Sequence, residues 1–413
     1  MSKLKSNLVY LTFAQAISYI FPLLTLPYLS HKLDPSDFGM LGVCQAIVQY
    51  FIIVTDYGFN ITTTKEISIN RNNKKKISKI FSTTLLAKIF LLFVSAIGLI
   101  ISGWAVKSIS GYELLLICCF VGVIGNTFYP LWLFQGTETM KIPVIMSSGA
   151  KLLLLLSIFI FVKDRADLNI AALLLNSGNF FAGILGLIYI KTRKLVFWYR
   201  PTLQEVYIIL LEGWPVFIST VAISFYTTFN TVLLSYKVSS AEVGFYNAAD
   251  KIRIAIQSMF GPITQAFYPR IVHLYKVERE AAINLLNKGM LLILGLTIPS
   301  ALLFFNCSDY IVAHYLSSSF SQTASYLKLL SFLPIIIGIA TVYCNWGLLG
   351  DGYGKVVSKI YVSFGLIHFL YATPLIIIFK VNGLILSVYI TQTLITLTTI
   401  YHYYRKVYNG FNK

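Results

Sequence analysis

The chain alternates long apolar segments with short polar connections along its whole length. Twelve apolar segments can be drawn, and each is long enough to cross a hydrocarbon core of about 30 Å as a helix. They are residues 8–30, 40–62, 80–103, 112–137, 142–162, 168–190, 207–236, 244–271, 288–306, 323–349, 358–379 and 384–404. The connections leave no room for a water-soluble domain. The pattern therefore predicts an all-α membrane protein with about 12 transmembrane helices.

The composition agrees with this pattern. The 413 residues are 57% hydrophobic and only 12% charged, with a mean hydropathy of +0.74. A soluble domain has about 25% charged residues. The first apolar segment is too long for the core of a signal peptide, and no small-residue cleavage site follows it. We therefore expect this segment to be retained as the first helix.

The basic residues are distributed unevenly between alternate connections. The net charge of +17 would suggest nucleic-acid binding in a soluble protein. Here 22 of the 33 Lys and Arg residues fall on the side of the two termini, and six fall in the opposite connections. Because Lys and Arg concentrate on the cytoplasmic side of membrane proteins, both termini are predicted to be cytoplasmic. We expect no nucleic-acid partner.

An internal repeat divides the chain into two halves. LDPSDFGMLGVCQAI at 33–47 aligns with VSSAEVGFYNAADKI at 238–252, and a weaker match pairs Trp132 with Trp346. Each half holds six apolar segments, so both halves enter the membrane in the same sense. Parallel repeats of this kind meet at a central pathway. We predict two six-helix bundles, formed by residues 1–206 and 207–413.

The eighth segment carries charges within its apolar sequence, including Lys251. Asp250 and Arg253 are three residues apart and share a helix face with Asn247. Arg253 lies roughly 15 Å from the helix start near Val243, close to the middle of a bilayer. An ion pair at that depth is costly unless it faces a wet cavity or partner helices. The pair either contacts a polar ligand or holds the bundle together.

Four stretches resemble the bacterial polysaccharide flippases, the Wzx (O-antigen translocase) family of the MOP exporter superfamily. They are LDPSDFGMLGVCQAIVQYFIIVTDYGFNITTTKEIS (33–68), PLWLFQGTETM (130–140), GWPVFISTVAISFYTTFN (213–230) and AEVGFYNAADKIRIAIQ (241–257). The resemblance implies a MATE-like fold of two bundles around a cleft that opens alternately to each side. It implies transport of undecaprenyl pyrophosphate bearing one oligosaccharide repeat unit, of O-antigen or capsule type, to the periplasmic leaflet of the inner membrane. Membrane lipids and the polysaccharide polymerase machinery are the further partners implied.

Buried cations and polar side chains suit such a cargo. A pyrophosphate–sugar head cannot cross hydrocarbon unaided, because its polar groups would lose their water without replacement. The candidate contacts are Lys151, Arg253, Lys251, Lys88, Gln45, Gln49 and Asn247. Lys151 lies roughly 13 Å into its segment, far from both ends. The alternative for Lys88 is snorkelling to its own end of the helix.

Three carboxylates are candidates for coupling transport to a proton or sodium gradient. They are Asp56, Asp250 and Glu212, since an intramembrane carboxylate can bind either ion. Gln45, Gln49 and Asp56 repeat at helical spacing and so define a polar face of the second segment. The alternative for Asp56 and Glu212 is a position at the membrane interface. No other cofactor is expected.

Two other function classes fit the sequence less well. A MATE-like, cation-coupled multidrug antiporter shares the two-bundle design but favours an acidic, aromatic cavity, whereas here the interior cations equal or outnumber the acids. A membrane enzyme would show large loops with clustered acidic or Arg and His residues. In the longest outer connection, Asn306–Gln322, Asp309 and His314 are the only acidic, Arg or His residues. The sequence contains no phosphate-binding loop and no nucleophile elbow. We predict a transporter and not an enzyme.

Overall fold

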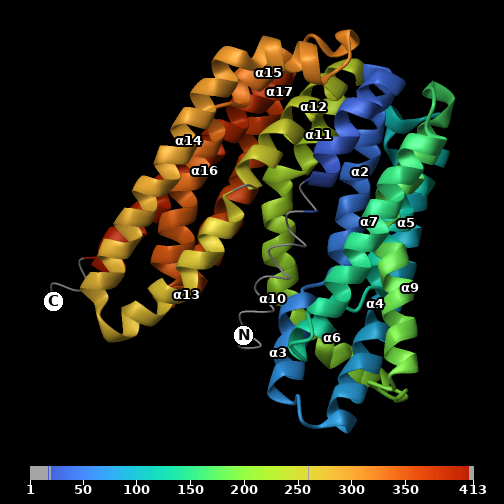
Figure 1. The fold of residues 1–413 in the computed structure, drawn as a ribbon, viewed down its shortest axis with the longest axis vertical. Coiled ribbons are helices and arrows are strands. Elements are labelled where there is room, and N and C mark those ends of the chain that lie inside the picture. Colours follow the sequence, from blue (N-terminus) through green and yellow to red (C-terminus); the bar gives the residue numbers. More distant parts are fainter. Residues whose placement is uncertain (1–16, 18–19, 259, 409–413) are drawn as a thin grey trace. The chain divides into compact units, whose positions relative to one another are not determined.

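The computed structural model describes residues 17, 20–258 and 260–408, and every regular element among these residues is a helix (Figure 1). The chain forms two compact units, Met1–Val221 (unit 1) and Ala222–Lys413 (unit 2). The boundary between the units falls within helix α10 (Leu203–Thr227). It lies later in that helix than the boundary that we placed after residue 206.

Unit 1 consists of apolar helices joined by short turns. Residues 20–32 are helical, and they are followed by α2 (Pro35–Asp56), α3 (Phe59–Ile69), α4 (Lys74–Ala105), η1 (Lys107–Ile109), α5 (Glu113–Phe128), α6 (Leu131–Gly136), α7 (Lys141–Phe161), η2 (Arg165–Asp167), α8 (Leu168–Asn176), α9 (Gly178–Thr192) and the first part of α10. Local chemistry sets several helix starts. Proline stands in the first turn of α2, and the Asn73 side chain caps α4 by accepting from the Lys76 amide at 3.1 Å.

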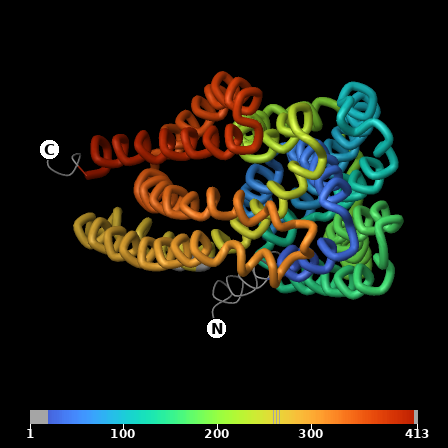
Figure 2. Tube along the Cα trace, turned by 90° about the horizontal axis from the view of Figure 1, so that it is seen from above, coloured from blue at the N-terminus to red at the C-terminus, as the bar shows by residue number. Residues whose placement is uncertain are grey.

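Unit 2 continues the same architecture. Its elements are α11 (Phe229–Ser235), α12 (Ser240–Ser258), α13 (Gly261–Val277), α14 (Arg279–Tyr315), η3 (Ser318–Phe320), α15 (Thr323–Leu330), α16 (Leu333–Thr341), the π-helical turn η4 (Val342–Leu349), α17 (Gly354–Tyr403) and η5 (Tyr404–Tyr408). Lys380 interrupts α17 with a φ of 52°, so α17 comprises two helical segments. In Figure 2 these two segments, the reddest parts of the tube, meet at an angle. The interruption falls between the predicted segments 358–379 and 384–404.

The helices are those of a multi-pass membrane protein. Within the described part of the chain, eight helices are long and apolar enough to cross a membrane, and a ninth is added if α8 and α9, bent by 40°, form one span. The first predicted segment begins outside the described residues. The eighth, which corresponds to α12 and α13, is not among these candidate spans, and α17 is counted once. The total of twelve crossings therefore stays a prediction.

The two units share an internal packing arrangement. Helices α2 and α12 begin at positions that the repeat aligns, and each is followed, after a short break, by a second helix. In unit 1, Thr64 of α3 donates to the Trp132 carbonyl at 3.3 Å. In unit 2, the Trp346 indole donates to the Thr264 carbonyl of α13 at 3.3 Å. Both tryptophans are fully buried, but Trp132 contributes its backbone carbonyl and Trp346 its indole, so the two contacts are not equivalent.

Candidate functional site

The second predicted segment, which carries the polar face of Gln45, Gln49 and Asp56, is broken into α2 and α3 directly after Asp56. Helix α2 ends at Asp56, Tyr57 and Gly58 adopt left-handed backbone angles with φ of 46° and 85°, and α3 starts at Phe59. Glycine is required at position 58 because a Cβ there would lie 2.7 Å from the Val216 Cβ of α10. The break leaves helix-terminal backbone groups without intrahelical partners close to the Asp56 carboxylate.

A buried polar cluster surrounds this carboxylate. Asp56 Oδ1 accepts from Asn60 Nδ2 at 2.5 Å and lies 3.9 Å from Lys88 Nζ. The Lys88 ammonium donates to the Asn126 carbonyl at 2.9 Å, and the Asn126 amide donates to Thr55 Oγ1 at 3.4 Å. Helices α2, α3, α4 and α5 therefore bring one cation and one carboxylate together inside unit 1.

The position of Lys88 tests whether its side chain snorkels to the end of its own helix. Its side chain is 1% exposed, and its ammonium contacts protein groups in the interior of unit 1. Lys88 therefore does not snorkel to the end of α4 in this conformation. Its contact with a ligand head group stays a prediction, because the groups that surround it here belong to the protein.

The other candidates of unit 1 lie on three helices. Gln45 is half-buried and Gln49 exposed on α2, Lys151 is half-buried on α7, and Glu212 is exposed on α10. The stem of Lys151 lies beside the bend between α8 and α9, since a Cβ added to Gly178 would meet Lys151 Cγ at 3.5 Å. The roles of these four side chains stay predictions.

In unit 2, the predicted pair is formed. Arg253 Nε donates to Asp250 Oδ1 at 2.7 Å, and Arg253 Nη1 donates to Gln257 Oε1 at 2.6 Å. The three side chains follow one face of α12, as spacings of three and four residues require. The arginine is 12% exposed, so the guanidinium is largely enclosed within unit 2.

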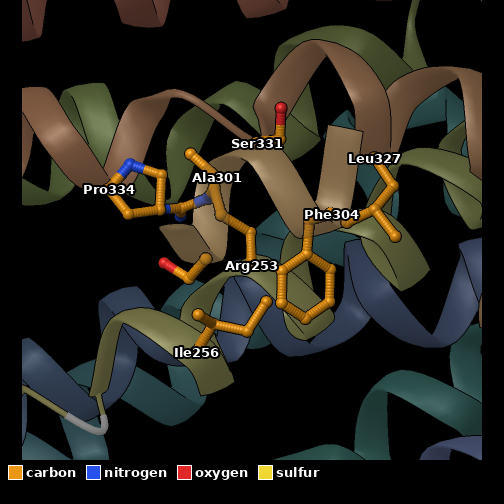
Figure 3. A pocket seen from close by; sticks show the side chains of 8 residues that line it. Arg253, Ile256, Ala301, Phe304, Leu327, Ser331 and Pro334 are labelled. Atoms are coloured by element: carbon orange, nitrogen blue, oxygen red, sulfur yellow. The ribbon is translucent and has the colours of Figure 1, made fainter. Parts of the chain in front are cut away.

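Arg253 also lines a crevice within unit 2 (Figure 3). The space measures about 220 Å³ including its opening, and it is lined by Arg253, Ile256, Ser300, Ala301, Phe304, Leu327, Ser331 and Pro334. These residues come from α12, α14 and α15, from the turn after α15 and from the start of α16. The crevice is mainly apolar, with one cation and two hydroxyl groups, and in this conformation it has room for about one water molecule.

Two further candidates lie on α12. Asn247 is buried and its Oδ1 accepts from Thr231 Oγ1 at 3.4 Å, but its Nδ2 has no hydrogen-bond partner among the described residues. An unpaired buried donor costs about 1–3 kcal/mol and indicates a site where a water or ligand would bind. Lys251 is half-buried. Whether either side chain contacts a ligand is untested.

The sequence analysis missed a second buried polar cluster in unit 2. His368 of α17 is fully buried, with Nδ1 2.6 Å from Thr391 Oγ1 and Nε2 2.8 Å from Asn230 Oδ1. A lone histidine in the middle of the apolar segment 358–379 was the only indication, because a polar side chain there needs partners. Among the residues that the structure describes, no group of three His, Cys, Asp or Glu side chains could hold a metal ion.

Comparison with known proteins identifies the family. Residues 4–275, well over half of the chain, match the family of polysaccharide biosynthesis proteins. The chain belongs to this family. A protein of Escherichia coli (strain K12) named "Putative O-antigen transporter" is 33% identical to this polysaccharide biosynthesis protein over 393 residues, which cover 95% of each chain. A protein of the same name from Shigella dysenteriae is 32% identical over 396 residues, covering 95% of this chain and 98% of the relative. The predicted family resemblance is confirmed.

Solved structures show the fold of this polysaccharide biosynthesis protein. An inward-facing multidrug resistance MATE family transporter of the MOP superfamily aligns with a TM-score of 0.75 and 14% identity, over 97% of this chain and 95% of that one. The lipid II flippase MurJ, in an inward closed conformation, aligns with a TM-score of 0.72 and 13% identity, over 95% of this chain and 86% of that one. The MATE-like fold of the MOP superfamily, which we predicted, is therefore confirmed.

Proposed function

We propose that this protein is a flippase for a lipid-linked oligosaccharide. Its cargo is undecaprenyl pyrophosphate bearing one repeat unit of O-antigen or capsule type, and it moves the cargo from the cytoplasmic to the periplasmic leaflet of the bacterial inner membrane. The observation that carries the proposal is the 33% identity, over 95% of both chains, to a protein named for O-antigen transport. The likeness of fold to a lipid II flippase supports it.

The proposed transport uses alternating access by two six-helix bundles. Twelve helices cross the membrane, and both termini are cytoplasmic. The division of α17 at Lys380 into two helical segments supports this number. The uneven distribution of Lys and Arg supports the orientation.

Paired charges supply a way to couple an ion gradient to a negatively charged cargo. Asp56 lies near Lys88, and Asp250 holds Arg253. A proton or sodium ion bound by either carboxylate would neutralise it and free the cation for the pyrophosphate. Arg253 could then grip phosphate with two parallel hydrogen bonds, whereas Lys151 and Lys88 would act as point charges. Glu212 is the third carboxylate proposed for coupling.

Deletion of the gene tests the proposal. Lipid-linked repeat units should accumulate on the cytoplasmic leaflet, surface polysaccharide should disappear, and a plasmid copy should restore it. A strain that lacks only the polymerase provides the control, since its repeat units should reach the periplasmic leaflet. Normal surface polymer in the deletion strain would refute the proposal.

The alternative function is a cation-coupled multidrug antiporter. The likeness of fold to a MATE transporter, with a TM-score of 0.75, supports it. Everted membrane vesicles with and without the protein can be mixed with a fluorescent cationic drug, because an exporter carries drug into such vesicles. Cation-dependent uptake of the drug, together with normal surface polymer in the deletion strain, would select this alternative. We expect no difference in drug export.

A further inference from the structure

Unit 2 contains a buried histidine, His368, to which the proposed function assigns no role. His368 lies in the first segment of α17 and has no exposed surface. Its Nε2 lies 2.8 Å from Asn230 Oδ1 on α11, and its Nδ1 lies 2.6 Å from Thr391 Oγ1 on the second segment of α17. Three helical segments thus meet at one imidazole ring.

The hydrogen bonds of Asn230 assign one proton of the ring. Asn230 Nδ2 donates to the Tyr226 carbonyl at 2.9 Å, which leaves Oδ1 facing His368 as an acceptor. Nε2 must therefore carry a hydrogen in either charge state of the ring. Nδ1 is the nitrogen whose protonation can change.

Thr391 can form a hydrogen bond with Nδ1 of His368 whether the ring is neutral or protonated. Its Oγ1 lies 2.7 Å from the Ser387 carbonyl and 2.7 Å from the Tyr371 hydroxyl, in addition to its contact with Nδ1. When the ring is neutral, the Thr391 hydroxyl donates to Nδ1. When the ring is protonated, Nδ1 donates to Thr391 Oγ1 and the threonine hydrogen turns to the Ser387 carbonyl. Every ring nitrogen keeps a partner in both states.

Among the described residues, the side chains that hydrogen-bond to the ring or lie in ring contact with it are all uncharged. The titratable ones are Tyr226 of α10 and Tyr371 of α17. The elements packed against α17 add Tyr343 and Cys344 on η4, Glu242, Tyr246, Asp250, Lys251 and Arg253 on α12, Tyr326 and Lys328 on α15, and Tyr404, Arg405, Lys406 and Tyr408 on η5. Helices α11 and α16 carry no ionisable side chain. Among the ion pairs of the described residues, none includes His368.

We propose that His368 is a proton-binding site of unit 2 and that Nδ1 takes up the proton from water. The enclosed ring has only neutral hydrogen-bond partners, and these cannot balance the charge of an imidazolium. Water that reaches the ring can solvate that charge. Proton uptake therefore favours separation of α11 from the two segments of α17, since a ligand shifts a protein toward the state that binds it better.

The inference deepens the proposed function, because a proton taken up on one side of the membrane and released on the other would drive the flippase. It differs from coupling through Asp56, Asp250 or Glu212. The neutral partners of His368 also favour a proton over a sodium ion, since Nε2 presents a hydrogen to the site and Nδ1 is the single free nitrogen lone pair.

Nitrogen NMR of the ring tests the site without any cargo. The full chain, labelled with ¹⁵N-histidine, is placed in nanodiscs of phosphatidylethanolamine and phosphatidylglycerol and titrated from about pH 8 to about pH 3. We expect one resonance, absent in His368→Gln, that keeps hydrogen on Nε2 and gains it on Nδ1 as the pH falls. A ring that stays neutral over the whole range would overturn the proposal.

Asn230→Asp provides a second measurement that does not depend on the glutamine variant folding. A carboxylate 2.8 Å from Nε2 supplies the missing counter-charge, so the proton affinity of His368 should rise at least about tenfold. His314→Gln is the matched control and should leave the His368 titration unchanged. An unaltered midpoint in Asn230→Asp would contradict the proposal.

Transport assays separate this inference from the proposed function. In vesicles with an imposed pH gradient, the wild-type protein should flip lipid-linked saccharide faster when the gradient is present, and His368→Gln should lose that acceleration. Equal acceleration in both would overturn coupling through His368 while leaving the flippase intact. If the wild type moves no saccharide at all, the proposed function fails, and the NMR titration still decides whether His368 binds a proton.

Discussion

The Lys88 ammonium lies 3.9 Å from the Asp56 carboxylate, and the two side chains differ greatly in exposure. Lys88 is 1% exposed, whereas the Asp56 side chain is 28% exposed. Part of the Asp56 side chain therefore lies at the protein surface, whereas the Lys88 charge is entirely enclosed by protein. The lysine depends on the carboxylate more than the carboxylate depends on the lysine.

This asymmetry predicts unequal effects of removing the two partners. Asp56→Asn leaves the buried ammonium without a counter-charge, so the free energy of unfolding should fall by about 3–5 kcal/mol. Lys88→Met should cost less, because Asp56 is partly exposed and keeps its hydrogen bond from Asn60. Thermal unfolding in detergent measures both, and the exposed Lys75→Met on the same helix is the control. If Asp56→Asn and Lys88→Met lowered the free energy of unfolding equally, Lys88 would not depend on Asp56 more than Asp56 depends on Lys88.

Gly58→Ala should destabilise unit 1. A non-glycine residue at a φ of 85° costs about 1–3 kcal/mol, and the added Cβ would overlap the Val216 side chain at 2.7 Å. Gly149→Ala is the matched control, since it is helical and nothing lies within 4 Å of its Cβ position. The control should be stabilised by about 0.5–1 kcal/mol. A Gly58→Ala protein that melts at the wild-type temperature would contradict this account of the helix break.

Lys151→Ala and Arg253→Ala should each abolish surface polysaccharide without removing the protein from the membrane. We propose that both cations bind the pyrophosphate head group, so each variant should lose that contact. Surface polymer is measured on intact cells, and immunoblots of membranes report the amount of protein. The exposed Lys276→Ala is the control for loss of a positive charge and should retain polymer.

Asp250→Asn distinguishes a structural from a functional Arg253. If the 2.7 Å bond mainly holds α12 in place, Asp250→Asn and Arg253→Ala should both reduce the amount of folded protein. If Arg253 contacts cargo, membrane levels of Arg253→Ala should stay normal while polymer is lost. Wild-type polymer in both Arg253→Ala and Lys151→Ala would exclude these side chains as contacts.

Arg279 and Asp351 predict a pH-dependent stability in unit 2. Arg279 Nη1 and Nη2 donate to the Asp351 carboxylate at 3.3 and 2.6 Å, and Nη2 also donates to the Val407 carbonyl at 3.0 Å. Burial raises the pKa of Asp351, and Arg279 opposes that rise. Arg279→Met should therefore raise the pKa of Asp351 further and cost about 2 kcal/mol at neutral pH.

The sign of the pH dependence follows from linkage. A carboxyl whose folded-state pKa lies above its unfolded value contributes stability at low pH, and this contribution is lost as pH rises through the folded-state pKa. The loss in Arg279→Met should thus be largest near neutral pH and shrink toward about pH 5. Melting temperatures in detergent at several pH values measure it, with the exposed Arg270→Met as control. A constant loss at all pH values would contradict the prediction.

Much of the fold could be predicted from the chain alone. In a membrane, each crossing segment must satisfy its own backbone hydrogen bonds, so a long apolar segment becomes a helix whatever surrounds it. The bond between Asp250 and Arg253 was also predictable, since residues three apart on a helix are neighbours. The repeat of residues 33–47 at 238–252 also indicated equivalent positions, since α2 and α12 begin at aligned residues.

The polar clusters were decided by tertiary structure. Lys88 meets Asn126, 38 residues later, and His368 meets Asn230, 138 residues earlier. Such contacts depend on how each helix is rotated and where its neighbours lie, and neither is encoded in the spacing of residues along one segment. The sequence could therefore show that a lysine or a histidine lay within an apolar helix. Only packing of the helices determined which groups would share its charge or its proton.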